Sequence, residues 1–570
     1  HADTASSSTI QARMVFPYST AVTISIRRAD ILRTLITFFL LAVAARPQTK
    51  APASETIRQQ ELEADLHFLA SDAMRGRLTG SREAQLTAAW IESRFQRLGL
   101  KPAGKRGLTQ VFGLTKSTLE AGNRLTIVRD GNAWNAKPLE DFYPLFFSAR
   151  GKSSGSVLFR GYGIDAPALG WRDGNGQTVS GHIALILTGE PGADDPKSIF
   201  DGVVTSVHSD PLKKALIAQS YGAAAVLLVN PSSGRFASAG RSYWPEKPPH
   251  LERYALTPLA DQLRIPVVEI SPAVAQTLLG DRKLADLANE AARGPITPVS
   301  LPRTVEVVTD LKRTVIDGRN VVAMIEGADP QLKNEAVLIT AHYDHNGATA
   351  EQIFNGADDN GSGTVALLEI AEAFTVAAQQ GQRPRRSVIF GAWDAEERCC
   401  GPLLGAAAWL EDPGWPVDKT VAVINMDMIG RSEEVPRGGG GRFNGLNLQT
   451  AESNAGAVNL IGYSYSEDMR QAALKANEFV GLTLRQRYDN NRSNLLRRSD
   501  HWVFLNRGVP ALFFHTGLHP DYHTQYDRPE RIDYAKLERV TRLVHQVAWN
   551  LAQSDSRPRM PAKRTIPDPD

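Results

Sequence analysis

Histidines and acidic residues follow several apolar runs in the second half of this chain, and they are of the types that bind divalent metals. His342 follows the run at 336–341, Glu396 and Glu397 follow 386–393, Asp427 follows 421–424, and His523 follows 510–514. Short apolar runs bounded by Gly, Asp and Asn are typical of buried parallel strands. Because ligands of open α/β sheets bind beyond the carboxyl ends of the strands, these side chains are predicted to meet at one edge. Imidazole and carboxylate together favour zinc or a similar ion.

Two acidic stretches near His342 have more than one interpretation. Asp344 is suited to accept a hydrogen bond from the second ring nitrogen of His342, which a metal-bound imidazole usually needs; the alternative is a hydrogen-bonded core histidine. The turn-rich stretch 355–363 carries Asp358 and Asp359 before a helix predicted over 364–378. Either aspartate could cap that helix, or one could bridge two metal ions as a shared carboxylate.

The adjacent pair Glu396 and Glu397 ends an apolar run, where acidic side chains are costly unless they have a function. Their side chains point in different directions, so one could bind metal while the other faces a reactive water. The alternative is a solvated helix start. At the last run, His515 and His519 compete with His523 for the ligand role.

Composition narrows the class of protein. A length of 570 residues predicts more than one domain. A hydrophobic fraction of 42% and a charged fraction of 22% are ordinary for a globular protein. The net charge of +2 argues against a nucleic-acid partner, which usually needs a basic face. The two adjacent cysteines, Cys399 and Cys400, allow no disulfide framework.

A signal peptide is predicted over 14–45. Arg27, Arg28 and Arg33 precede an apolar segment at 35–45 that is too short to span a bilayer. Small residues at 42–44 form a cleavage signal. The protein is therefore expected to be exported, to the periplasm or outside the cell, with no stable membrane anchor after cleavage. The alternatives are a membrane anchor or a buried helix.

The motifs taken together resemble a known family. They are His342-Tyr-Asp344, Gly356-Ala-Asp-Asp-Asn-Gly-Ser-Gly363, Asp394-Ala-Glu-Glu397, Asn425-Met-Asp427, Ser499-Asp-His501 and Tyr522-His523. They resemble the co-catalytic zinc aminopeptidases of metallopeptidase family 28, which also includes glutamate carboxypeptidase and, more distantly, the transferrin receptor. The resemblance runs from about Ile57 to Leu551. It implies an α/β fold with a mixed, mostly parallel sheet sandwiched by helices.

The resemblance also implies roles for individual residues and two Zn²⁺ per chain. The family's bridging aspartate lies three residues before a Ser-Gly pair, which selects Asp359 over Asp358. His342 and Asp427 would hold one zinc with Asp359, and Glu397 and His523 would hold the other. Glu396 would be the general base, and Tyr522 would steady the developing oxyanion. The stretch 398–405 departs from the family's usual short turn.

A division of the chain into segments follows. Helices predicted over 57–70 and 84–98 fall in an N-terminal part of the peptidase domain at 55–149. Residues 150–290 are rich in Gly, Ser and Pro and carry no ligand cluster, and their strand pattern resembles an inserted, β-rich protease-associated (PA) domain. The catalytic segment is placed at 304–554. The Pro-rich, charged tail at 557–570 is predicted to be disordered.

The expected function is an exported aminopeptidase that removes N-terminal residues from peptide substrates. Three alternatives stay open. A metallo-carboxypeptidase would place basic residues at the pocket, and Arg492, Arg497 and Arg498 keep this possibility. A glutaminyl-cyclase-like enzyme would use one zinc. A non-catalytic binding relative would have lost ligands or the base, and neither is lost here.

Overall fold

The computed structural model describes residues 9–13, 23–27, 49–105, 107–129, 131–231, 253–398, 403–439 and 441–569. The chain forms one compact unit at His1–Lys50 and another at Ala51–Asp570. In the first, β1 (Thr9–Arg13) pairs with β2 (Thr23–Arg27) in antiparallel fashion. The apolar segment at 35–45 and the pair Cys399–Cys400 lie outside the described residues, so the signal peptide stays a prediction.

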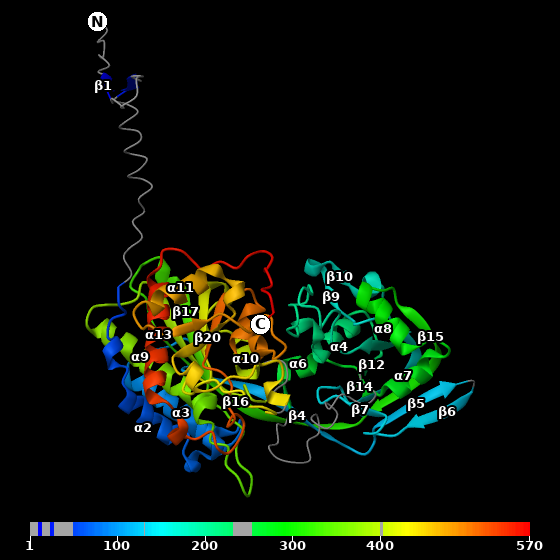
Figure 1. Cartoon of the computed structure of the whole chain (residues 1–570). Coiled ribbons are helices and arrows are strands. Elements are labelled where there is room, and N and C mark those ends of the chain that lie inside the picture. The colour runs from blue at the N-terminus through cyan, green and yellow to red at the C-terminus, as the bar shows by residue number, and fades with distance from the viewer. Residues whose placement is uncertain are drawn as a thin grey trace. The chain divides into compact units, whose positions relative to one another are not determined.

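A 10-stranded mixed sheet contains the predicted strands that the candidate ligands follow (Figure 1). In spatial order its strands are β13 (Tyr254–Leu256), β4 (Thr109–Leu119), β16 (Leu311–Ile325), β18 (Ser387–Trp393), β17 (Ala336–His342), β19 (Thr420–Met426), β22 (Ala511–His515), β20 (Ala457–Ile461) and β21 (Thr483–Arg485), and β3 (Lys101–Pro102) pairs with β16. The central strands β18, β17, β19 and β22 are parallel. The strands that flank them, β16 and β20, pair with them in antiparallel fashion.

Helices cover both faces of this sheet, because its strands are apolar on both sides. Along β17, Val337 and Ile339 belong to one core, whereas Ala336 and Leu338 belong to the other. The first core is covered by α2 (Gln59–Leu69), α3 (Arg82–Arg97), α9 (Gly363–Gln379), α11 (Glu467–Asn477) and α13 (Tyr534–Gln553). The second is covered by α10 (Leu404–Glu411) and α12 (His501–Leu505). The predicted α/β sandwich is confirmed, and α2, α3 and α9 lie where helices were predicted.

Helix α9 and the turn before it, Ala357–Gln379, are long and apolar enough to cross a membrane. In this structure 83% of the apolar window is buried inside the protein. A core helix of a globular domain passes the same test, so the observation is weak evidence for a membrane span.

A second, 8-stranded sheet contains β6 (Asn132–Ala136), β5 (Arg124–Arg129), β15 (Val299–Thr309), β8 (Gly151–Phe159), β11 (Ile183–Leu187), β12 (Ala225–Val229), β14 (Val267–Ile270) and β7 (Phe142–Pro144), in that order. Helices α7 (Pro272–Leu279) and α8 (Leu284–Arg293) pack on one face (Figure 1). Helices α4 (Pro211–Ser220) and α6 (Thr257–Gln262) pack on the other.

The strand pairings do not follow the predicted limits of 150 and 290. Strands β5, β6 and β7 precede residue 150 and β15 spans residue 304, yet all four belong to the second sheet. Conversely, β13 lies inside the predicted insert but pairs with β4 of the first sheet. The reason is that antiparallel partners can come from distant parts of a chain. The identity of this region as a PA domain stays a prediction.

The tail at 557–570, predicted to be disordered, has ion pairs with the rest of the protein in this structure. It contains no helix or strand up to residue 569. Arg557 pairs with Glu335 at 2.8 Å, and Arg559 pairs with Asp468 at 2.9 Å. Arg564 pairs with Asp201 at 3.0 Å. A tail without an apolar core of its own is thus held by charged side chains that reach acidic partners elsewhere.

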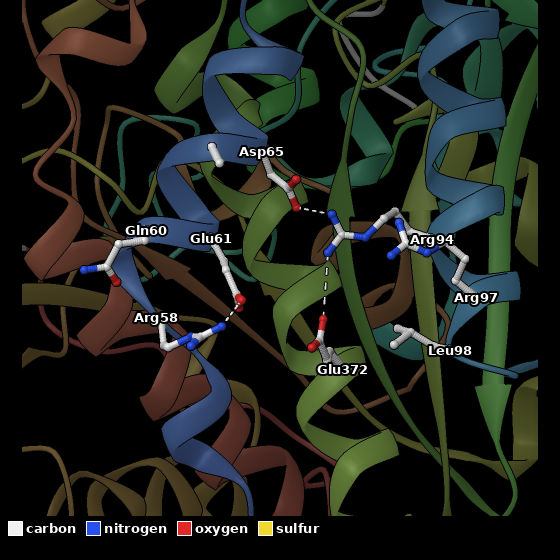
Figure 2. Close-up of a pocket in the computed structure, with 9 residues that line it drawn as sticks. Arg58, Gln60, Glu61, Asp65, Arg94, Arg97, Leu98 and Glu372 are labelled. Atoms are coloured by element: carbon white, nitrogen blue, oxygen red, sulfur yellow. Dashed lines mark hydrogen bonds and ion pairs between the residues drawn. The ribbon is translucent and has the colours of Figure 1, made fainter.

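A hollow with a volume of about 560 Å³ lies beside α2 and α3, and none of the predicted metal ligands lines it. Figure 2 shows the residues that line it. At its edge Arg94 forms an ion pair with Asp65 and lies 3.9 Å from Glu372. Behind them, the buried carboxylate of Glu369 lies 3.7 Å from Arg94. Burial, with the nearby charges of Glu61 and Glu372, raises the pKa of Glu369 to about 9. The hollow is therefore lined by a network of basic and acidic side chains, and the buried Glu369 lies behind it.

This network predicts how stability depends on pH. The folded pKa of Glu369 lies above its ordinary value, so the folded state binds more protons and its stability falls as pH rises towards about 9. We expect Glu369→Gln to raise the melting temperature at about pH 8 and to raise it less at about pH 5. Thermal unfolding followed by circular dichroism measures this, with the more exposed Glu372→Gln as control. A gain independent of pH would contradict it.

Candidate metal centre

The parallel strands place their carboxyl ends side by side, as the sequence predicts. His342, the last residue of β17, pairs in register with Trp393 at the end of β18. Met426, the last residue of β19, pairs with Phe514 near the end of β22. The residues that follow these strands therefore start from one edge, and that edge is where the candidate ligands meet.

The first group of candidate ligands surrounds His342. Its Nε2 atom lies 3.5 Å from Oδ1 of Asp427 and 3.5 Å from Oδ1 of Asp359. Nε2 of His342 and Oδ1 of Asp427 are buried without a hydrogen-bond partner. Donor atoms that each lie about 2 Å from one ion are roughly 3–3.5 Å apart. The three residues thus fit a divalent cation.

The second group surrounds His523. Its Nε2 atom lies 2.9 Å from Oδ2 of Asp359 and 3.2 Å from Oε2 of Glu397. Asp359 therefore directs one carboxylate oxygen to each group, Oδ1 to His342 and Oδ2 to His523. This is the arrangement required of a carboxylate shared by two metal positions.

The structure separates Asp359 from its neighbour Asp358. Oδ1 of Asp358 accepts a hydrogen bond from the backbone of Gly430 at 2.6 Å, and Oδ2 lies 3.3 Å from His519. Asp527 accepts hydrogen bonds from the backbone amides of both aspartates, at 2.9 and 3.0 Å. Both carboxylate oxygens of Asp358 therefore have partners within the protein. Asp527 holds the turn in which Asp359 lies.

The competing histidines also have other contacts. His519 faces Asp358, and Nδ1 of His515 lies 2.9 Å from the backbone oxygen of Asp427. Of the three histidines near the end of the last parallel strand, His523 is the one beside Asp359 and Glu397.

Asp344 lies beneath the site, and its contacts differ in part from the prediction. Nδ1 of His342 lies 3.3 Å from the backbone oxygen of Asp344 and 3.7 Å from its carboxylate. The carboxylate instead accepts hydrogen bonds from the backbone amides of Glu396 and Glu397, at 3.0 and 3.3 Å. Thr79 donates to it as well, at 3.1 Å. Asp344 therefore positions both glutamates in addition to its contact with His342.

Glu396 and Glu397 have opposite electrostatic environments. Burial, with the charges of Glu397 and Asp427, raises the pKa of Glu396 well above its usual range. Burial would also raise the pKa of Glu397, but the imidazoles of His523 and His345 outweigh it and hold that pKa well below its usual range. Neighbouring carboxyl groups with pKa values driven apart suit different roles. The less acidic Glu396 is suited to hold a proton, and Glu397 is suited to bind a cation.

A narrow hollow opens beside these groups. Its polar lining is Asp359, Glu396, Asp427, Arg498, His515, Tyr522 and His523, and its apolar lining is Met428, Leu495, Phe513 and Leu518. The Tyr522 ring lies 3.9 Å from that of His523, centroid to centroid. Burial and the charges of nearby Asp359 raise the pKa of Tyr522 well above its usual range, so its hydroxyl keeps its proton and can donate a hydrogen bond.

Sequence reasoning missed two contributors to this site. His345 is fully buried, and its Nδ1 atom lies 2.7 Å from Oε1 of Glu397. Arg77, between the helices predicted at 57–70 and 84–98, donates to the backbone oxygens of Tyr343 and Gly356 at 2.7 and 2.8 Å. His345 could have been found from its place in the same run as His342 and Asp344. No sequence pattern indicates Arg77, because its hydrogen bonds go to backbone oxygens, which every residue has.

Comparisons with known proteins agree with this geometry. Residues 320–548 match the family model described as Peptidase family M28, and they contain every predicted ligand. This segment belongs to peptidase family M28. The match includes Glu396, Tyr522 and Asp344 as well.

Curated relatives of the M28 segment include two kinds of peptidase. The chain is 27% identical over 279 residues to "Probable glutamate carboxypeptidase AMP1" of Arabidopsis thaliana, covering 46% of this chain and 35% of that protein. It is 27% identical over 232 residues to "Aminopeptidase YwaD" of Bacillus subtilis, covering 40% of this chain and 43% of that one. The chain thus spans less than half the length of each relative. The solved aminopeptidase from Aneurinibacillus sp. strain AM-1 is 18% identical, with a TM-score of 0.48, covering 92% of this chain and 99% of that one.

A loop from the second-sheet region supports one wall of the M28 site. The backbone amide of Val203 donates to Asn490 at 3.0 Å, and that of Thr205 donates to Asn494 at 2.8 Å. Arg497 returns a hydrogen bond to the oxygen of Thr205 at 3.0 Å. The segment 490–497 contains Leu495, which lines the hollow, and directly precedes Arg498, which lines it as well. Arg492, which pairs with Asp194, and Arg497 thus serve this contact, whereas Arg498 faces the hollow.

We expect that removing this support changes substrate binding more than chemistry. Asn490→Ala leaves the buried amide of Val203 without its acceptor, which costs about 1–3 kcal/mol of local stability. The Michaelis constant for a small substrate should rise and metal content should stay unchanged. Steady-state kinetics with metal analysis checks this, and Arg507→Ala is the control, because the exposed Arg507 pairs with Glu411 and not with this loop. Loss of metal in Asn490→Ala would show that the loop supports the metal centre instead.

Proposed function

We propose that this chain is an exported di-zinc aminopeptidase that hydrolyses N-terminal residues from peptides. The observation that carries the proposal is Asp359, whose two carboxylate oxygens face two separate groups of ligand atoms. Membership of family M28 and the aminopeptidase among its relatives support peptide hydrolysis. Export rests on the predicted signal peptide alone.

His342, Asp427 and Asp359 would hold one zinc, and Glu397, His523 and Asp359 would hold the other. When bound, the ions would lower the pKa of water and polarise the scissile carbonyl. Glu396 lines the hollow and is positioned by Asp344, so it takes a proton from the attacking water. As the carbon–oxygen bond forms and the carbon–nitrogen bond breaks, Glu396 delivers that proton to the leaving amine. The protonated hydroxyl of Tyr522 stabilises the oxyanion by a hydrogen bond.

The charge of the hollow favours a free N-terminus. Glu396 and Asp427 line it from one side together with Asp359, and carboxylates attract a substrate ammonium group next to the scissile bond. The apolar residues Met428, Leu495, Phe513 and Leu518 would accept an apolar side chain of the substrate.

One observation favours a second candidate, a metallo-carboxypeptidase. Arg498 lines the same hollow, and a guanidinium binds a carboxylate well through two parallel hydrogen bonds. The relatives described as probable glutamate carboxypeptidases support the same alternative. Arg498 is a single positive group among three carboxylates, so we place the aminopeptidase first.

A substrate series separates the two. A free dipeptide, its N-acetylated form and its C-amidated form are offered to the purified, zinc-loaded protein. Acetylation should abolish hydrolysis, because it removes the ammonium charge that the carboxylates attract, and amidation should be tolerated. Hydrolysis that survives acetylation but is lost on amidation would identify a carboxypeptidase. Hydrolysis of none of the three by a fully loaded protein would contradict both.

A further inference from the structure

We propose that His345 is a fourth protein ligand of the metal ion held by Asp359, Glu397 and His523. The inference rests on the proposed metal centre and goes beyond the ligand set that the family resemblance implies. It makes the two metal positions chemically unequal.

The position of the His345 ring is the first argument. Its side chain is fully buried, and its Nδ1 atom lies 2.7 Å from Oε1 of Glu397 and 3.9 Å from Oδ2 of Asp359. The ring of His523, which contacts the same two carboxylates, lies 5.7 Å away, centroid to centroid. Candidate ligand atoms of His345, Asp359 and Glu397 all lie within 4.8 Å of one another. These separations fit ligands of one ion.

The hydrogen-bonding state of these atoms is the second argument. Nδ1 of His345 and Oε1 of Glu397 lie 2.7 Å apart in a buried place, and neither has a further hydrogen-bond partner among the described residues. With the imidazole neutral, both atoms offer an electron pair there. A cation between the donors satisfies both, whereas an unpaired buried polar group costs about 1–3 kcal/mol.

The surrounding backbone holds the ring in this position. Arg77 accepts a hydrogen bond at its backbone oxygen from the amide of His345 at 3.3 Å, and Arg398 donates to the oxygen of His345 at 3.2 Å. Gly356 has φ +58°, and a Cβ atom there would collide with the imidazole. A glycine is therefore required beside His345, in the same turn that presents Asp359.

Unequal metal affinities follow from this assignment. The position at His342 has one imidazole, from His342, with Asp427 and Asp359. The other position has two imidazoles, from His345 and His523, with Glu397 and Asp359. An added nitrogen ligand strengthens the binding of late first-row metals, so this position should fill first and empty last.

Cobalt titration of the metal-stripped full-length protein tests the assignment. Co²⁺ binding is followed by equilibrium dialysis and by the visible absorption spectrum, which reports the ligands. We expect the wild-type protein to bind one Co²⁺ more tightly than a second. His345→Ala should weaken the tighter site at least about 10–100-fold, the loss typical even of an outer-shell partner, and should change its spectrum.

A cysteine substitution makes the test direct. In His345→Cys a thiolate that touches the ion would add an intense sulfur-to-cobalt absorption band, absent from wild type. His545→Gln is the matched control, because His545 is equally buried but packs against Phe374 in the core. It should leave cobalt binding unchanged while reporting the cost of removing a buried histidine.

The outcomes are distinguishable. An unchanged cobalt spectrum in His345→Ala and no new band in His345→Cys, with both variants folded by circular dichroism, would overturn the inference and leave His345 as a residue that positions Glu397. Failure of the wild-type protein to bind cobalt would instead reject the metal centre itself.

Discussion

Replacing Glu396 by glutamine is expected to lower kcat about 10²–10⁴-fold while metal content stays at the wild-type level. Glutamine has nearly the same shape, keeps the backbone hydrogen bond to Asp344, and cannot take a proton from water. Glu396 is also the carboxyl whose pKa burial raises, which suits it to the proposed proton exchange. Steady-state kinetics and metal analysis on the same preparation check both parts of the result.

Glu397→Gln is the matched control, because it makes the same replacement of a carboxylate by an amide at the adjacent residue. Its carboxylate lies 3.2 Å from His523, so this variant should lose metal as well as activity. If Glu396→Gln lost metal and Glu397→Gln retained it, the roles of base and ligand would be reversed.

The sequence could predict that the candidate ligands gather at one edge, because the order and direction of the strands decide which strand ends lie side by side. Once 336–341, 386–393, 421–424 and 510–514 are identified as neighbouring parallel strands, the residues after them must share an edge. Choosing among adjacent candidates required more than this pattern. Only the contacts of Asp358 with Gly430 and of His519 with Asp358 show that these two residues serve the framework.

Other features depend on long-range contacts that local patterns do not record. The second sheet recruits β5 and β15 from outside the predicted insert, because antiparallel pairing joins strands 170 or more positions apart, as in Thr304 with Val128. Arginines of the tail reach Glu335 and Asp468, and a Pro-rich composition alone indicates neither of these partners. His345 was not identified from the sequence, since its contact with Glu397 depends on how the two strand ends meet.

Replacing Asp359 by asparagine is expected to remove most of both metal ions and to lower activity at least about 10²-fold. Asp359 is the residue within reach of both groups, through Oδ1 at 3.5 Å from His342 and Oδ2 at 2.9 Å from His523. Asparagine keeps one oxygen, loses the negative charge, and places an amide that donates hydrogens where the second ion needs a ligand. Metal analysis after dialysis against a weak chelator, beside kinetics, measures both effects.

Asp358→Asn is the control for this experiment, because it makes the same change one residue away. Its contacts are to Gly430 and His519, so it should lower the melting temperature yet retain both ions. Retention of two equivalents of metal by Asp359→Asn would show that the two positions do not share this carboxylate. Loss of one ion with the other held would mean that Asp359 belongs to a single position. In that case His345, beside Glu397 and His523, would supply the ligand that keeps the remaining ion bound.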